Sequence, residues 1–128
     1  MKIFKLKDTP KTPAIEFNSE QGKLILKGRS IPENSIDFFK PLHDWVDNYI
    51  ENAPNQTIID MKLEYFNTSS SKCLLDLLKR FEHLNSGGKQ VTINWYYENN
   101  DSDMAEAGED YQAIVKIPFN IIAVEEII

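Results

Sequence analysis

The chain has few of the side chains that most catalytic and metal sites need. It contains one cysteine, Cys73, and two histidines, His43 and His83. One cysteine excludes an internal disulfide and favours a reducing cytoplasm. The acidic residues from Glu98 to Asp110 lack the spacing of a calcium loop, and no histidine or cysteine joins them. We therefore expect no metal ion.

Long apolar runs and a basic surface are also missing. No apolar run approaches the roughly 20 residues that span a bilayer, and the first residues lack the apolar core of a secretory signal. The net charge is −6 with an isoelectric point near 4.9. Such a chain has no basic stripe to neutralise phosphates. These absences predict a cytoplasmic protein that binds neither nucleic acid nor membrane.

Several catalytic motifs are absent as well. There is no G-x-G-x-x-G sequence, phosphate-binding loop or G-x-S-x-G elbow, so nucleotide binding and a typical serine hydrolase have no sequence support. A small hydrolase that uses Ser69, Ser70 or Ser71 with one of the two histidines stays an alternative of another class. We expect no cofactor.

What is present is a regular alternation of apolar patterns. A period of two predicts strands, and three- and four-residue spacing predicts amphipathic helices. We expect strands at 14–18, 23–28, 57–66, 89–97 and 118–124, and helices over about 35–50 and 70–84 and within 98–115. We expect the lysines before the first strand, Lys2, Lys5, Lys7 and Lys11, to lie on a solvated arm.

This order predicts one α/β domain spanning residues 1–128, with a mixed sheet of about five strands and about three helices. The strand at 57–66 is polar on one face, since Asp60, Lys62 and Glu64 alternate with Ile59, Met61, Leu63 and Tyr65. A sheet with helices on both faces would have strands that are apolar on both faces. We therefore expect the helices to pack mainly on one face.

The most informative stretch joins the long strand to the second helix, where Asn67 is followed by Thr68, Ser69, Ser70 and Ser71. One small polar residue suffices to cap a helix, so four consecutive hydroxyls exceed that need. A helix N-terminus also favours a phosphate. The stretch is therefore either a helix cap alone or a site of regulatory phosphorylation.

Three motifs together resemble those of the SiaC family of bacterial regulatory phosphoproteins. They are 12–15 (Thr-Pro-Ala-Ile), 32–35 (Pro-Glu-Asn-Ser) and 65–72 (Tyr-Phe-Asn-Thr-Ser-Ser-Ser-Lys). The similarity extends to Gly87-Gly88-Lys89 and to 94–97, and so spans nearly the whole chain. The resemblance implies a STAS-like fold, as in anti-sigma-factor antagonists, and no enzymatic activity.

The resemblance also implies a function. In the family a Ser/Thr kinase phosphorylates the threonine of the Asn-Thr-Ser-Ser motif and a PP2C-type phosphatase removes the phosphate. The unphosphorylated form activates a diguanylate cyclase in cyclic-di-GMP and biofilm signalling. By motif the acceptor is Thr68, and Asn67, Ser69, Ser70 and Ser71 form the surface that partners contact. The acid-rich segment Glu98 to Asp110 departs from the family pattern and leaves a second target open, an anti-sigma factor or other protein. A homodimer also stays open.

Overall fold

The computed structural model describes residues 3–127, which form one six-stranded sheet with the strands in sequence order. Strands β1 to β3 form an antiparallel meander, and β3 to β6 run parallel. The mixed sheet confirms the predicted fold class. The elements are β1 (Ile3–Leu6), β2 (Ala14–Asn18), β3 (Lys23–Ser30), α1 (Ser35–Glu51), β4 (Gln56–Phe66), α2 (Thr68–Lys79), α3 (Glu82–Ser86), β5 (Gln90–Glu98), α4 (Ser102–Ile114) and β6 (Phe119–Val124).

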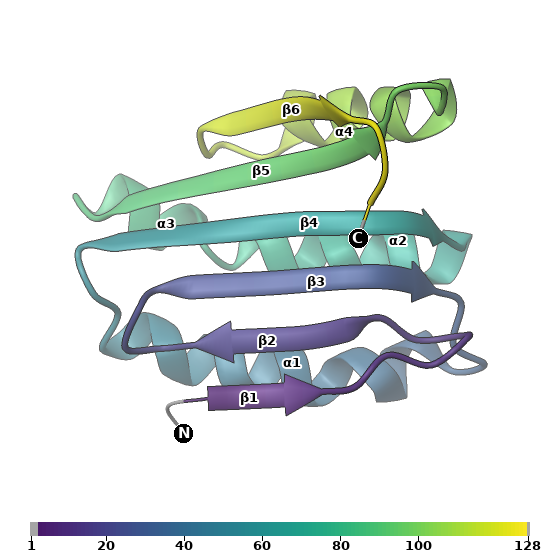
Figure 1. Ribbon diagram of the computed structural model, residues 1–128. Coiled ribbons are helices and arrows are strands. Elements are labelled where there is room, and N and C mark those ends of the chain that lie inside the picture. Colours follow the sequence, from purple (N-terminus) through teal and green to yellow (C-terminus); the bar gives the residue numbers. More distant parts are fainter. Residues whose placement is uncertain (1–2, 128) are drawn as a thin grey trace.

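All the helices lie behind one face of the sheet (Figure 1), as the polar alternation of the long strand predicts. The core lies between these two layers and includes the apolar faces of β4 and β5 and the apolar stripes of α1 and α2. Its largest fully buried side chains are those of Trp95, Phe17, Phe39 and Phe81. Packing of this kind supplies most of the stability of a domain of this size.

The sheet face without helices carries a row of polar contacts across four strands. Lys23 Nζ lies 2.9 Å from Asp60 Oδ2, and Asn94 Nδ2 donates to Asp60 Oδ1 at 3.0 Å. Asn120 Nδ2 donates in turn to Asn94 Oδ1 at 3.1 Å. Asp60 is only 4% exposed, and the lysine and amide contacts compensate the cost of burying its charge.

The first strand is a correction to the sequence prediction. Ile3–Leu6 pairs with β2 and adds a sixth strand where we expected a solvated arm. Phe4 explains the difference, because its ring packs against the buried Phe17 with centroids 6.2 Å apart. Lys5 points to solvent beside Glu16, 3.8 Å away. Lys2 lies outside the described residues.

The second predicted helix is also divided. Helix α2 ends at Lys79, and the short α3 follows from Glu82. The apolar stripe nevertheless continues through Phe81 and Leu84, which are both buried, so periodicity did not reveal the break. Among residues 3–127, no helix has the length and apolar character that crossing a bilayer requires.

Candidate functional site

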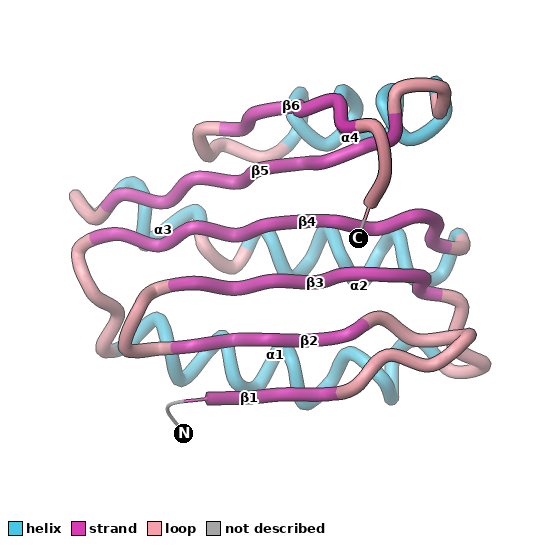
Figure 2. Tube along the Cα trace, viewed as in Figure 1, coloured by secondary structure: helices cyan, strands magenta, loops and turns pink. Residues whose placement is uncertain are grey.

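The hydroxyl-rich stretch lies where two parallel strands end and two helices begin. Strands β3 and β4 finish at the same edge of the sheet, and α1 and α2 start beside them (Figure 2). The side chain of Asn34 accepts from the backbone N–H of Asp37 at 3.1 Å and caps α1. The side chain of Asn67 accepts from the backbone N–H of Ser70 at 2.9 Å and caps α2. We call this region the capped corner, defined by residues 34–37 and 67–71.

Thr68 is the first residue of α2 and is exposed. Within the described chain its hydroxyl has no recorded hydrogen-bond partner, whereas those of the three following serines all have one. The positive end of the α2 dipole lies beside it. Thr68 therefore offers a free hydroxyl to an approaching enzyme.

Ser69 and Ser70 connect the two helix starts. Ser69 Oγ is exposed and lies 2.7 Å from Ser35 Oγ in the first turn of α1. Ser70 is fully buried, donates to the backbone carbonyl of Ser30 at 3.0 Å, and accepts from Ser30 Oγ at 2.8 Å. Ser70 therefore supports the corner from beneath and has no surface for direct contact with a partner.

Ser71 ties the corner to α4. Tyr111 Oη donates to the carbonyl of Ser71 at 2.7 Å and lies 3.1 Å from its hydroxyl. Burial raises the pKa of Tyr111 to about 12, so the phenol stays protonated and can donate. Ser71 is half-buried, and its hydroxyl is engaged in this contact.

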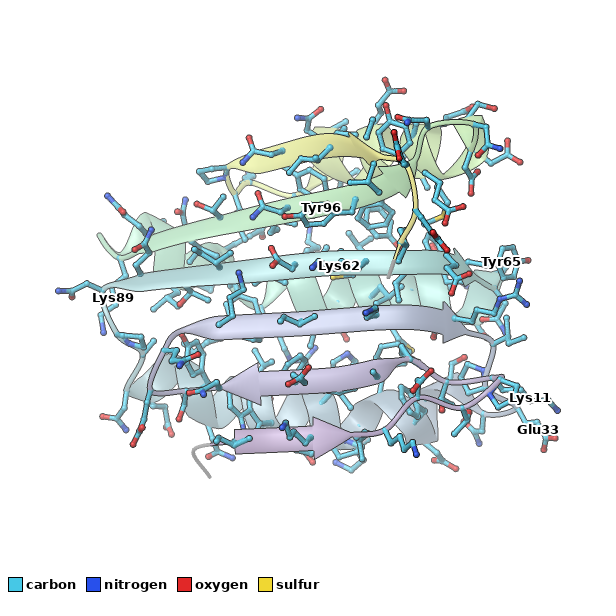
Figure 3. The ribbon with its side chains drawn as sticks, in the orientation of Figure 1. Lys11, Glu33, Lys62, Tyr65, Lys89 and Tyr96 are labelled. Atoms are coloured by element: carbon cyan, nitrogen blue, oxygen red, sulfur yellow. The ribbon has the colours of Figure 1, made fainter. Side chains whose placement is uncertain are left out.

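A bulge at the end of β4 reverses the expected direction of one aromatic side chain. Gly28 pairs with Leu63 but Arg29 pairs with Tyr65, so Glu64 is the extra residue in β4. The shift turns Tyr65 outward, where it is 53% exposed beside the capped corner (Figure 3). The prediction that Tyr65 faces the core with Leu63 is therefore wrong, because alternation in sequence does not reveal a bulge.

Phe66 takes the inward position instead. Its ring stacks on Tyr111 with centroids 6.2 Å apart and meets the edge of Trp95 at 5.9 Å. The same side of the molecule has a second exposed apolar residue, Ile36 in the first turn of α1, which is 75% exposed. Sequence reasoning missed Ile36 as well, although it stands outside the apolar stripe of its helix. An apolar residue outside the apolar stripe of an amphipathic helix is expected to be exposed, so the sequence did contain a sign of this surface position.

The geometry gives no support to a serine hydrolase, a nucleophilic cysteine or a metal site in the described part of the chain. His43 Nε2 contacts the backbone carbonyl of Cys73 at 3.0 Å, and His83 is exposed on α3. No hydrogen bond joins either histidine to a serine of the corner in the described part of the chain. Burial, followed by the charge of Asp76, raises the pKa of the Cys73 thiol, which makes it a poor nucleophile at neutral pH. Among residues 3–127 no group of acidic, histidine or cysteine side chains could hold a metal ion.

The acidic segment has a structural use of its own. Asp101 caps α4 by accepting from the backbone N–H of Met104 at 3.1 Å. Glu106, Glu109 and Asp110 lie on the exposed side of that helix. The acids of α4 therefore form a solvated face on one side of that helix, as charge patterning predicts.

Comparison with known proteins gives consistent results. A model of the SiaC family of regulatory phosphoproteins matches residues 6–124. An uncharacterized protein of Pseudomonas aeruginosa (strain UCBPP-PA14) is 35% identical over 118 residues, which is 92% of this chain and 94% of the relative.

Solved structures agree in fold as well as in sequence. SiaC of P. aeruginosa, in its complex as activator of the diguanylate cyclase SiaD, has a TM-score of 0.89 and 33% identity, covering 94% of this chain and 99% of that one. A structure of SiaC from the same organism has a TM-score of 0.87 and 32% identity, covering 97% and 100%. The apo-SiaC structure gives 0.86 and 32%, covering 96% and 100%.

Proposed function

This chain belongs to the SiaC family of regulatory phosphoproteins, and from that premise we propose that it is a switch whose state is set by phosphorylation of Thr68. In the unphosphorylated state it binds and activates a diguanylate cyclase. A Ser/Thr kinase adds the phosphate and a PP2C-type phosphatase removes it. The chain itself acts in the cytoplasm and catalyses no reaction.

The observation that carries this proposal is the position of Thr68. It is an exposed hydroxyl at the first turn of a capped helix, in a turn that holds no acidic side chain. A phosphate there adds about −1.5 to −2 charges next to the free amides of α2. Both the accessibility to a kinase and the favourable place for the charge support the assignment.

The fold needs no rearrangement to accept the phosphate. Thr68 is exposed and its hydroxyl makes no hydrogen bond within residues 3–127, whereas Ser70 and Ser71 hold the first turn of α2 from beneath. The effect of the phosphate therefore falls on partner binding. A double charge placed in an interface costs several kcal/mol, and each 1.4 kcal/mol changes an affinity about tenfold. That is sufficient for on/off control.

The relative in the SiaD complex supports the choice of target. That protein is the activator of a diguanylate cyclase, and its fold superposes on nearly this whole chain. We propose that Asn67, Thr68 and Ser69 lie at the centre of the corresponding contact here. Ser70 and Ser71 shape that surface without forming it.

Incubation with the cognate kinase and ATP, followed by peptide mass spectrometry, tests the acceptor. We expect phosphate on Thr68 and none in Thr68→Ala. Ser69→Ala is the matched control, because it removes the neighbouring exposed hydroxyl and should still be labelled. Label that persists in Thr68→Ala would sink the assignment.

The target is tested by the rate of cyclic-di-GMP formation by the cognate cyclase. The unphosphorylated chain should raise that rate, and the phosphorylated chain should leave it at the basal level. An unchanged rate with both forms, together with capture of an anti-sigma factor, would favour the alternative target.

A further inference from the structure

The two edges of the sheet differ in their protection against pairing with another strand. An edge strand presents unpaired backbone N–H and C=O groups, and proteins commonly blunt such an edge by making the strand short or by placing a lysine on it. Strand β1 has both features, because it has four residues and carries the exposed Lys5. Strand β6 at the other edge has six residues, Phe119–Val124, and none of them is charged. The edge that stays open to another strand is therefore β6.

Hydrogen bonds to β5 determine which backbone groups of β6 point away from the sheet. The N–H of Ile93 donates to the carbonyl of Pro118 at 2.9 Å, and the N–H of Asn99 donates to the carbonyl of Val124 at 2.8 Å. Because the backbone groups of a strand point alternately to its two sides, the even-numbered residues of β6 face β5. The residues whose N–H and C=O groups face outward are the odd-numbered ones, Phe119, Ile121 and Ala123.

Gln112 of α4 occupies one end of this outward edge. Its Nε2 donates to the carbonyl of Phe119 at 2.9 Å. Within residues 3–127, no hydrogen bond is recorded for the outward groups of Ile121 and Ala123. The chain after β6 turns back over the helix-free face (Figure 1), where the N–H of Ile127 donates to Glu98 Oε2 at 3.1 Å. The free part of the edge therefore consists of Ile121 and Ala123.

We propose that β6 pairs with β6 of a second copy of this chain, antiparallel about a two-fold axis perpendicular to the sheet. Residues directly opposite each other in such a pair point to the same face of the sheet. The register that uses both free residues places Ile121 of one copy opposite Ala123 of the other. Ile122 then lies on the two-fold axis, opposite Ile122 of the second copy. The dimer is independent of the proposed function, because β4 and the capped corner lie two strands away from this edge.

A second copy fits because the free edge is complementary to itself. In the proposed register Ile121 and Ala123 exchange both of their backbone hydrogen bonds, and the two-fold axis repeats the exchange. The alternative register, with Ile121 opposite Ile121, would pair Ala123 with Phe119, whose carbonyl already accepts from Gln112. Ile121 and Ile122 are half-buried and point to opposite faces, so the pairing covers apolar surface on both sides of the sheet.

The acids of α4 are compatible with this arrangement, although each copy carries −6. Glu109 lies three residues before Gln112, and so on the same side of that helix. The two Gln112 residues mark the ends of the seam, about 20 Å apart, which leaves the two Glu109 residues roughly 10 Å apart along it. That separation exceeds the Debye length of about 8 Å at physiological ionic strength. The other exposed acids of α4 project about 120° or more around the helix axis from Gln112; they are Asp103, Glu106 and Asp110.

The acid that follows β6 also avoids its own copy. In the proposed register Glu125 lies opposite Phe119 of the second copy, and the two Glu125 residues stand at opposite ends of the seam. Between them every residue of β6 is neutral. No like charges therefore face each other directly across the pair, an arrangement that would be destabilising.

Sedimentation velocity of the purified chain at about 0.15 M salt, from about 1 μM to about 1 mM protein, tests for the dimer. We expect a reversible monomer–dimer equilibrium. Ile122→Lys should raise the dissociation constant about tenfold or more, because two lysines would face each other on the axis. Ile3→Lys is the matched control, since Ile3 is an exposed isoleucine on the other edge strand. It should dimerise as the wild type does.

The backbone pairing is tested at Ala123, which is exposed. Ala123→Pro removes an outward N–H that does not bond β5, and should also raise the dissociation constant about tenfold. Ala123→Ser keeps this N–H and should dimerise as the wild type does. Thermal unfolding by circular dichroism verifies that the variants fold, and Ile122→Lys decides the test if the proline variant does not.

The register is tested by oxidation in a Cys73→Ala background. Ile122→Cys should form a disulfide between two copies, because opposite residues in a pair without hydrogen bonds have Cα atoms about 4.5 Å apart. Asn120→Cys is the control on the same strand and face. In the proposed register the two Asn120 residues lie four residues, or about 14 Å, apart along the seam, so this variant should not be cross-linked.

Three results would overturn the dimer. The first is a wild-type chain that stays monomeric over the whole concentration range. The second is a dimer that Ile122→Lys leaves intact or that Ile3→Lys weakens equally. The third is cross-linking of Asn120→Cys as readily as of Ile122→Cys. None of these results bears on phosphorylation of Thr68, so the two proposals can fail separately.

Discussion

Helices α1 and α2 begin with similar sequences, Asn34-Ser35-Ile36-Asp37 and Asn67-Thr68-Ser69-Ser70, yet their first turns are occupied differently. In both, the asparagine side chain accepts a backbone N–H three residues later. The first hydroxyl of α1, on Ser35, is 5% exposed, and Asp37 supplies a carboxylate at the dipole end. The first hydroxyl of α2, on Thr68, is exposed, and its first turn has no acid.

This difference supports the proposal that the same capping motif serves two purposes, a structural one in α1 and a regulatory one in α2. Helix α1 already has the negative charge that its N-terminus favours. Helix α2 leaves that place vacant next to a free hydroxyl, so a phosphate can supply the charge reversibly. The cap alone does not distinguish the two helices; exposure and the missing acid do, and both support the switch proposed at Thr68.

The largest difference in stability between the two helices is expected when an aspartate replaces the first residue of each, Ser35 in α1 and Thr68 in α2. Ser35→Asp should lower the free energy of unfolding by more than about 2 kcal/mol, because the carboxylate would be buried among hydroxyls. Thr68→Asp should fold normally and weaken cyclase binding strongly. Urea unfolding of both variants measures this contrast, and equal stabilities would contradict the burial argument.

The next effect concerns the two serines that follow Thr68. Ser70→Ala should lower the free energy of unfolding by about 1–3 kcal/mol, because it leaves the buried hydroxyl of Ser30 without its acceptor. Ser69→Ala should cost less than about 1 kcal/mol, since water can replace the lost contact. Chemical denaturation distinguishes them. A larger loss from Ser69→Ala would refute the assigned support role of Ser70.

The two caps should be of similar strength. Asn34→Ala and Asn67→Ala should each cost about 1 kcal/mol, within a range of about 0.5–2 kcal/mol. Hydrogen exchange of the first-turn amides of each helix reports the local loss. A clearly smaller effect at Asn67 would mean that the Ser30 and Tyr111 contacts, and not the cap, fix the start of α2.

The smallest expected effect is the change in stability when a negative charge is added at the N-terminus of α2 or removed from that of α1. Thr68→Asp should raise the free energy of unfolding by about 0.3–1 kcal/mol, and Asp37→Asn should lower it by a similar amount. Both changes should shrink as salt screens the charges. Thermal unfolding at low and high salt measures them, with Thr68→Asn as the uncharged control. A salt-independent effect would contradict the electrostatic explanation.

Much of the fold followed from apolar periodicity, because the strands and helices that form the core alternate regularly. The polar face of the strand at 57–66 also predicted the single helical layer. Apolar periodicity did not predict the features that depend on tertiary packing. Ile3–Leu6 forms a strand because Phe4 packs on Phe17, and a bulge at Glu64 turns Tyr65 outward.

The candidate site was likewise predicted only in part from the sequence. The surplus of hydroxyls after Asn67 drew attention to the corner, and the family resemblance selected Thr68. Sequence could not show that Ser70 is buried or that Ser71 meets Tyr111, because those contacts are 40 residues away in the chain. Ile36 and Tyr65 were missed for the same reason: exposure is set by tertiary neighbours.

The most direct test of the switch is the affinity for the cognate cyclase before and after complete phosphorylation of Thr68, measured by isothermal titration calorimetry in one buffer. An interface penalty of several kcal/mol predicts that the phosphorylated chain binds at least about 100-fold more weakly. Equal affinities of the two forms would contradict the switch.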